Sequence, residues 1–315
     1  MVCPLCKKEN SVLCYGHIRH DTNYKLVACD NCNLFYLNPF PTKMKIKSFY
    51  GSKYYYDNPV NDGVFATKSL LFFNSIKKYL PSGGCSLDVG CSKGFLSYFF
   101  KKHNFDAYGI DLSSKACSFA RKIGVNAIAS DLLNYNPNKK FDVITIIDLI
   151  EHVDEPQKVL KKANSLLKKG GLLIVSTPNI KSFYSKISKS NWAGFDLPFH
   201  IIYFSKDSLS FGLKNAGFKS NNFLTDSFNL ISIEGLLRTN LNVYFGKLLE
   251  FFGLRTKFRQ NFMLPKIKIV SKQKNIILGV KITIVDKLKM LINYPLNVIF
   301  NGLLLGDSLI SISRK

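Results

Sequence analysis

Apolar and polar stretches alternate regularly along the middle of the chain. Short apolar runs, typical of buried strands, are followed by segments with the three- and four-residue spacing of amphipathic helices. The predicted strands cover residues 85–89, 106–110, 125–129, 141–147, 172–176 and 218–224. The predicted helices cover residues 64–80, 94–103, 114–123, 155–168 and 206–216. Strands that alternate with helices form a parallel sheet covered on both faces, so we expect an α/β fold of the Rossmann-like type.

The first of these strands runs into the turn D-V-G-C-S-K-G at residues 88–94. Glycines in such a turn let the backbone bend sharply and approach a ligand closely. A dinucleotide-binding turn would read G-x-G-x-x-G, and this turn fits that pattern poorly. Asp88, Asp111 and Asp131 each stand at the end of a predicted strand, at the edge where open α/β sheets bind ligands. We therefore expect three carboxylates along one rim, spaced for an extended nucleoside.

Two C-x2-C pairs stand near the N-terminus. The first consists of Cys3 and Cys6, and the second of Cys29 and Cys32. Two such pairs at this spacing predict a tetrahedral zinc ribbon, which we assign to residues 1–45. Four thiolates leave no open coordination position, so the expected zinc ion is structural.

The order of these features resembles the class I S-adenosylmethionine (SAM) methyltransferases. The turn at 88–94 matches their first motif, D/E-x-G-x-G-x-G, with Ser92 in place of the middle glycine. The resemblance implies a seven-stranded sheet whose last strand is antiparallel, and it implies SAM as the cofactor. The residues that it assigns to SAM binding are Asp88, Gly90, Gly94, Asp111, Leu112, Asp131, Leu132 and Asp148.

The segment D-L-I-E-H-V at residues 148–153 resembles the E-x-x-E-H-V segment of ubiquinone-type O-methyltransferases. In those enzymes the side chains can hold a divalent cation, which implies a Mg²⁺ site at Asp148, Glu151 and His152. Two carboxylates and an imidazole are chemically able to bind such an ion. The same segment lines the SAM pocket in relatives that need no metal, so both interpretations stay open.

Residues 198–205 read P-F-H-I-I-Y-F-S, which resembles a segment shared by zinc-ribbon methyltransferases of sugar and secondary metabolism. In related deoxysugar C-methyltransferases the histidine that matches His200 is a catalytic base preceded by an acid. Here Phe199 replaces the acid, and the large third domain of that family is absent. Removal of one proton from a hydroxyl needs a single histidine, so His200 is the predicted base, with His152 as second candidate. The alternative is a core histidine that orients the loop.

The remaining boundaries follow from changes in composition. Residues 46–82 are expected to be a linker and leading helix, 83–227 the SAM-binding core, and 306–315 the last core strand. Residues 228–305 form a predicted helical insertion in which apolar runs alternate with Lys and Arg. Polar residues interrupt its longest apolar run, which argues against a membrane span. It is expected to be an amphipathic surface that touches an anionic membrane or lipid-linked acceptor, or else a plain helical subdomain.

Composition adds charge and compartment to this picture. The chain has 315 residues, 46% of them hydrophobic, with 44 Lys and Arg against 21 Asp and Glu, a formal charge of +23. This favours a packed protein with an anionic partner, or simply a solvated basic surface. No apolar signal segment precedes Cys3, so we expect a cytoplasmic protein whose cysteines are reduced for metal, with a peripheral position at the inner membrane face as the alternative.

Together these features predict a SAM-dependent methyltransferase that methylates a hydroxyl of a sugar, nucleotide-sugar or lipid-linked glycan. An RNA methyltransferase with the basic ribbon as its binding module is the first alternative, although no N-P-P-Y segment follows the fourth strand. A sugar C-methyltransferase and a non-catalytic SAM-binding scaffold are the others. The sequence leaves the oligomeric state and the acceptor open.

Overall fold

The structure is a computed structural model of the whole chain. It describes residues 2–9, 11–15, 24–42, 44, 62–192, 194–197, 199–226, 269–272, 275–278 and 301–315.

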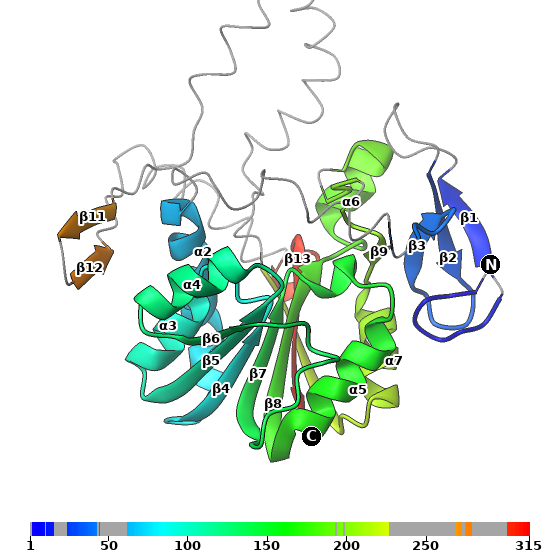
Figure 1. The fold of residues 1–315 in the computed structure, drawn as a ribbon. Coiled ribbons are helices and arrows are strands. Elements are labelled where there is room, and N and C mark those ends of the chain that lie inside the picture. Colours follow the sequence, from blue (N-terminus) through cyan, green and yellow to red (C-terminus); the bar gives the residue numbers. More distant parts are fainter. Residues whose placement is uncertain are drawn as a thin grey trace, which may run out of the picture.

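A seven-stranded sheet forms the centre of the molecule (Figure 1). Its strands, in spatial order, are β10 (Ser220–Asp226), β13 (Ser308–Arg314), β8 (Leu167–Pro178), β7 (Phe141–Ile147), β4 (Gly84–Val89), β5 (Phe105–Asp111) and β6 (Asn126–Ala129). Strand β13 runs antiparallel to both of its neighbours, β8 and β10. The pairs β4–β5, β4–β7, β5–β6 and β7–β8 are parallel. The carboxyl ends of the parallel strands therefore meet at one edge of the sheet.

Helices cover both faces of this sheet. They are α2 (Asp62–Ile76), α3 (Phe95–Lys102), α4 (Ser114–Lys122), α5 (Pro156–Leu166), α6 (Phe183–Ser188) and α7 (Lys206–Asn215), with short 3-10 turns at Lys77–Tyr79, Ile150–His152 and Lys189–Asn191. Alternation along β8 shows the two faces. Leu172 and Ile174 pack with Phe73 of α2 and Phe100 of α3. Their neighbours Leu173 and Val175 pack into the other core, beneath α5 and α7. The alternating pattern thus buries both sides of each central strand, as the sequence predicts.

A second, four-stranded sheet lies beside the first and carries the N-terminus (Figure 1). It consists of β1 (Ser11–Tyr15), β2 (Lys25–Cys29), β3 (Phe35–Asn38) and the two-residue strand β9 (Ile202–Tyr203). Strand β9 belongs to the segment that carries His200, and it pairs with β3 through Phe35–Tyr203 and Tyr36–Ile202. The cysteine-rich N-terminal part and the segment that carries His200 therefore share one sheet.

The predicted fold class is confirmed, including the seven strands and the antiparallel last strand. Most of the helical insertion predicted at 228–305 lies outside the described residues. Within it, β11 (Ile269–Lys272) and β12 (Asn275–Leu278) form an antiparallel pair that the sequence analysis missed. Among the described residues, no helix is long and apolar enough to pass through a membrane. Contact between the insertion and a membrane surface stays a prediction.

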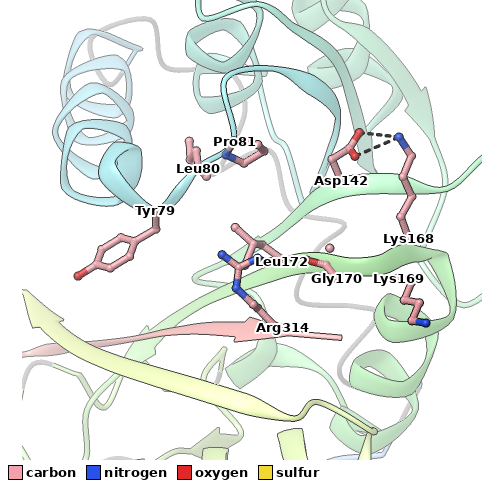
Figure 2. Close-up of a pocket in the computed structure, with 10 residues that line it drawn as sticks. Tyr79, Leu80, Pro81, Asp142, Lys168, Lys169, Gly170, Leu172 and Arg314 are labelled. Carbon is pink, nitrogen blue, oxygen red and sulfur yellow. Dashed lines mark hydrogen bonds and ion pairs between the residues drawn. The ribbon is translucent and has the colours of Figure 1, made fainter.

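The hollow drawn in Figure 2 has a volume of about 270 Å³ and lies at the opposite edge of the sheet. Asp142 lines it from the start of β7, Lys168 and Lys169 from the start of β8, and Arg314 from the end of antiparallel β13. The Lys168 ammonium lies 2.8 Å from the Asp142 carboxylate. Because the hollow does not include the carboxyl ends of the parallel strands, it is distinct from the rim that carries the predicted site residues.

Candidate active site

The glycine turn after β4 is held against the end of β5. The N–H groups of Gly90 and Cys91 both donate to the carbonyl of Ile110, at 2.8 and 3.0 Å. Gly90 has a φ of 75°, and Ser92, at the middle glycine position, also adopts a left-handed φ of 49°. Gly94 has a φ of 77°, and a Cβ there would lie 2.7 Å from the Cβ of Ala120. The turn therefore needs glycine at its last position for close helix packing and tolerates serine in the middle.

Asp111 joins this turn to the start of α4. One carboxylate oxygen accepts from the N–H of Ser92 at 2.9 Å, and the other accepts from the N–H of Ser113 at 2.8 Å. The residue is only 8% exposed. A carboxylate oxygen can accept more than one hydrogen bond, so Asp111 is pre-oriented to receive further donors such as a pair of ribose hydroxyls. This supports the role predicted for it.

Asp88 and Asp131 were also expected to contact SAM, but their carboxylates are already held by other groups of the protein. The Asp88 carboxylate is buried and accepts from the hydroxyls of Thr145 at 2.6 Å and Ser97 at 3.3 Å. Burial raises the pKa of Asp88 to about 7. Although partial burial raises the pKa of Asp131, hydrogen bonds from Asn134 outweigh it and hold this pKa below its usual value. Both carboxylates are thus engaged within the protein, and their contact with SAM stays a prediction.

The leucines that follow Asp111 and Asp131 differ in their exposure. Leu112 is 67% exposed directly after Asp111, while Leu132 is only 4% exposed and belongs to the main core. Its neighbour Leu133 is 40% exposed. A flat apolar ligand such as an adenine ring could therefore reach Leu112 or Leu133, and the prediction that Leu132 contacts the cofactor is not supported by its position.

The end of β7 carries the second group of predicted residues. Asp148 has a left-handed φ of 47°, and its N–H donates to the carbonyl of Ser176 at 2.9 Å. Its side chain is exposed, yet protein atoms crowd around it and raise the pKa of its carboxyl. The positive charge of Lys68 on α2 opposes that rise. Lys68 was not singled out in the sequence, because nothing local to α2 shows which rim residue it faces.

Glu151 is fully buried one turn further on. Its Oε2 accepts from the Thr177 hydroxyl at 3.0 Å. Its Oε1 is buried and has no hydrogen-bond partner within the part of the chain that the structure describes. Burial, reinforced by the nearby Asp148, raises the pKa of Glu151 well above its usual value. The Glu151 carboxyl therefore favours its protonated form more strongly than an exposed glutamate does.

His152 and His200 face each other, with ring centroids 4.7 Å apart. The Nδ1 of His152 bonds the Phe199 carbonyl at 2.9 Å, and the Nδ1 of His200 bonds the Gly194 carbonyl at 2.8 Å. Since a carbonyl only accepts, each ring carries its proton on Nδ1. Burial lowers the pKa of His152 to about 3, and burial also lowers the pKa of His200. Both imidazoles are thus neutral at pH 7, and the Nε2 of His200 keeps a lone pair.

The predicted Mg²⁺ ligand set needs a correction. Ligand atoms of Glu151, His152 and His200 all lie within 4.8 Å of one another, and Asp148 is not part of this group. The reason is the loop that crosses the end of β7: the N–H of Ile201 donates to the Glu151 carbonyl at 3.0 Å and brings His200 into place. Each segment is recognisable in the sequence, but no sequence feature indicates that the two segments meet.

The aromatic residues around His200 are buried. Trp192, Phe195 and Tyr203, which flank His200 in the sequence, are at most 2% exposed. Trp192 and Phe195 pack edge to face, with centroids 5.2 Å apart. They form a core beneath the His200 loop rather than a surface for an acceptor.

The four N-terminal cysteines meet at one point. The Cys3 and Cys32 sulfurs are 3.6 Å apart, and those of Cys6 and Cys29 are 3.5 Å apart. These separations are far longer than a disulfide bond, and they suit sulfurs about 2.3 Å from a shared tetrahedral ion. The Cys32 thiol lowers the pKa of Cys3 to about 5, which favours a thiolate there. The donor set therefore fits a structural zinc ion.

The reversed strand β13, the glycine turn and the acid that closes β5 together define a class I, SAM-dependent methyltransferase fold. Residues 65–221 match the family model described as "Methyltransferase domain", and this part of the chain belongs to that family.

Two curated relatives are ubiquinone biosynthesis O-methyltransferases. The one from Coxiella burnetii (strain RSA 493 / Nine Mile phase I) is 35% identical over 100 residues, which cover 30% of this chain and 43% of the relative. The one from Paraburkholderia phymatum is 32% identical over 122 residues, which cover 36% of this chain and 53% of the relative. The chain thus spans about half the length of the curated relatives it matches.

Solved structures of similar shape include two SAM-dependent methyltransferases. One, from Thermotoga maritima and described as a possible histamine N-methyltransferase, is 19% identical with a TM-score of 0.48, covering 79% of this chain and 89% of that one. The other, from Archaeoglobus fulgidus, is 17% identical with a TM-score of 0.48, covering 80% of this chain and 98% of that one.

Proposed function

We propose that the chain is a SAM-dependent O-methyltransferase that acts on a small-molecule hydroxyl. The strand order, the glycine turn and the pre-oriented Asp111 support SAM as the cofactor. Bound SAM supplies a methyl group on a sulfonium that is already activated for transfer. The name shared by the curated relatives supports oxygen as the methylated atom.

The observation that carries the proposal is the state of His200. Its Nδ1–H is used by the Gly194 carbonyl, and its Nε2 lone pair is therefore the proton acceptor. Because burial lowers the pKa of His200, the imidazole is neutral and able to accept a proton at pH 7. His200 takes the proton of the acceptor hydroxyl, which is worth roughly 10²–10⁴-fold in rate for such a base.

The test replaces His200 with Ala and with Gln. His200→Ala should leave SAM affinity intact by calorimetry and lower turnover by about 10²–10⁴-fold. His200→Gln keeps a polar side chain but cannot accept a proton near neutral pH, so it should be equally slow. His103→Ala is the matched control, because His103 contacts Phe73 on a helix away from this loop. Full activity in the Gln variant would show that His200 only positions the acceptor and would favour His152 as base.

The acceptor class can be tested by offering the protein three classes of acceptor together with labelled SAM. The P-F-H-I-I-Y-F-S segment supports a sugar, nucleotide-sugar or lipid-linked glycan, and the relatives' name supports a ubiquinone precursor. We rank the sugar class first because it is linked to the segment that carries His200. RNA is a third arm, motivated by the charge of +23. Methyl transfer from labelled SAM only to the ubiquinone precursor or only to RNA would overturn the sugar assignment.

For the cysteine site we propose one structural zinc ion held by Cys3, Cys6, Cys29 and Cys32. The sulfur separations of 3.5–3.6 Å support it. Elemental analysis of protein purified without added metal should give about one zinc per chain. A zinc content that survives replacement of Cys29 and Cys32 by serine would contradict this site.

A second candidate function for the rim is a divalent metal site at Glu151, His152 and His200. The proximity of their ligand atoms and the unpartnered Oε1 of Glu151 favour it. Two imidazoles and one carboxylate suit Zn²⁺, Mn²⁺ or Fe²⁺ better than Mg²⁺. Protein with the cysteine site loaded would then bind a second metal ion that Glu151→Gln removes. A metal content of only one ion per chain at saturating Mn²⁺ or Zn²⁺ would exclude it.

A further inference from the structure

The orientation of His200 depends on two hydrogen bonds. Its ring donates to the Gly194 carbonyl at 2.8 Å, and its own carbonyl accepts from the Tyr203 hydroxyl at 2.9 Å. The first fixes the proton on Nδ1, and the second fixes the backbone of the loop. A shift of either partner would change where the Nε2 lone pair points.

Gly194 and Tyr203, the two hydrogen-bond partners of His200, both lie close to Trp192. A Cβ built on Gly194 would lie only 2.4 Å from a carbon of the Trp192 ring, so the backbone of Gly194 lies directly against the indole. The Tyr203 ring centroid lies 6.4 Å from that of Trp192, with Phe195 between them in edge-to-face contact with each. Trp192 is 2% exposed. The indole is therefore the surface that sets the position of both groups that hold His200.

Trp192 in turn faces Asp307, which immediately precedes β13. The side chains of Ser182 and Trp192 act on the Asp307 carboxyl as hydrogen-bond donors. Its Oδ1 is buried without a hydrogen-bond partner in the described part of the chain. Burial raises the pKa of this carboxyl to about 6, against the effect of the two donors. Asp307 is therefore a half-buried acid, with one shielded carboxylate oxygen, beside the only tryptophan of the chain.

The backbone of Asp307 is itself fixed to the end of β8. Its carbonyl accepts from the N–H of Asn179 at 2.7 Å, and the Asn179 amide donates to the Gly306 carbonyl at 3.0 Å. A Cβ on Gly306 would lie 2.5 Å from Asn301 Oδ1 and 3.0 Å from Thr225. The carboxyl thus projects from a well-anchored point of the sheet edge toward the indole.

We propose that Trp192 and Asp307 are positioning residues that form a brace between the last strand and the His200 loop and so set the direction of the His200 imidazole. The brace rests on the proposed role of His200 only for its effect on catalysis. The brace itself concerns the tautomer of His200 and the environment of Asp307. It also gives a role to the shielded Oδ1 of Asp307.

The first measurement is the fluorescence of the single tryptophan. Trp192 emission should change between about pH 5 and 7 as Asp307 titrates, and the change should be absent in Asp307→Asn. The groups that act on Asp307, Ser182 and Trp192, do not titrate in this range. His200→Gln should keep the transition, which excludes the imidazole as its source. A transition that persists unchanged in Asp307→Asn would overturn the contact, and Asp207→Asn, on the exposed start of α7, is the matched control.

The second measurement is the tautomer of His200 by nitrogen-15 NMR of protein labelled at its five histidines. The brace predicts a single Nδ1–H form in the natural protein and a mixture with Nε2–H in Asp307→Asn and Trp192→Phe. Trp192→Phe removes the indole N–H but keeps an aromatic ring, and Asp307→Asn guards against a failure of that variant to fold. An unchanged His200 tautomer in both variants would overturn the brace. A changed tautomer with normal turnover would uphold the brace and reject His200 as the base.

Discussion

The β4–β5 half and the β7–β8 half of the candidate site differ in whether their polar atoms have hydrogen-bond partners. On the β4–β5 side, each oxygen of Asp111 is bonded by a backbone N–H, and the glycine turn is tied to the Ile110 carbonyl. On the β7–β8 side, the Oε1 of Glu151 has no partner in the described structure, and the Nε2 lone pair of His200 stays available. The first half therefore suits the proposed cofactor, and the second suits the proposed base or the proposed metal.

The halves also differ in how they are assembled. The β4–β5 half comes from neighbouring strand ends and one turn, within residues 88–113. The other half needs the end of β7 and a loop more than forty residues later, which the pairing of β9 with β3 holds in place. The β4–β5 half, the proposed cofactor half, is thus local, while the β7–β8 half, the proposed acceptor half, depends on the N-terminal sheet. Removing single elements should therefore damage the halves unequally.

The largest effect should come from loss of the cysteine site. In Cys29→Ser/Cys32→Ser the proposed metal, worth on the order of 10 kcal/mol in small zinc domains, cannot bind. Since β3 pairs with β9, amides of residues 200–204 should exchange with solvent at least ten times faster, while those of β4 and β5 stay protected. Hydrogen exchange with mass spectrometry measures both halves in one experiment.

Cys14→Ser is the matched control, because Cys14 is exposed and outside the four-sulfur cluster. SAM affinity should be nearly unchanged in the double variant. If SAM binding is lost together with protection at residues 200–204, the two halves are not separable and the comparison fails.

The next effect is a pH dependence at Asp88. Its pKa is raised from 3.8 to about 7 in the folded protein, so the folded state holds this proton more tightly than the unfolded state. Its contribution to the free energy of unfolding is therefore fully present below pH 4 and is lost as the pH rises to about 7. Asp88→Asn lacks this dependence, so its stability relative to the natural protein should rise over that range by up to about 4 kcal/mol.

Urea unfolding at pH 4, 5.5 and 7.5 gives this difference directly. Asp207→Asn, at an exposed acid of α7, is the matched control. A difference for Asp88→Asn that is flat with pH would mean that Asp88 is ionised in the folded state.

A smaller effect is expected for SAM binding at Asp111. Asp111→Ala removes the proposed ribose acceptor and should weaken SAM by about 1–3 kcal/mol, measured by calorimetry. Asp131→Ala should weaken it less, because both oxygens of Asp131 already bond Asn134. Equal losses in the two variants would show that the bonds to Asn134 do not withdraw Asp131 from the cofactor.

The smallest effect is expected at Leu112. If adenine packs on this exposed side chain, Leu112→Ala should weaken SAM binding by about 1 kcal/mol at unchanged stability. Val12→Ala, on a residue 55% exposed in β1 of the N-terminal sheet, is the control. Unchanged affinity in Leu112→Ala would leave Leu133 as the apolar neighbour of the cofactor.

The sequence predicts the fold well because its signals are local. Strands β4, β5 and β7 lie within a residue of their predicted bounds, and a glycine turn or an acid marks their ends. Strand β8 starts five residues early because Leu167 pairs with Phe141 ahead of the Lys168–Gly171 bulge. Local patterns cannot show such pairing.

The site is predicted less completely because its geometry is set by distant partners. Asp88 is turned inward by Thr145, a residue of another strand, so its position in the motif does not reveal its burial. His200 was found from its motif, but its neighbours Glu151 and His152 come together with it only through the loop that carries β9. Asp307 and Trp192 had no sequence signal beyond the rarity of tryptophan.

The pairing of β3 with β9 has a consequence for the order in which the chain is made. Phe35 leaves the ribosome long before Tyr203, its partner in the sheet. Until residues 202 and 203 emerge, β3 is an outer strand with unsatisfied backbone groups, the kind of edge that invites pairing with other chains. Metal binding can close the cysteine site early, but it leaves this edge open. Slow synthesis of the segment between them should therefore favour aggregation, and a chain cut short before β9 should depend on chaperones even when its cysteines hold zinc.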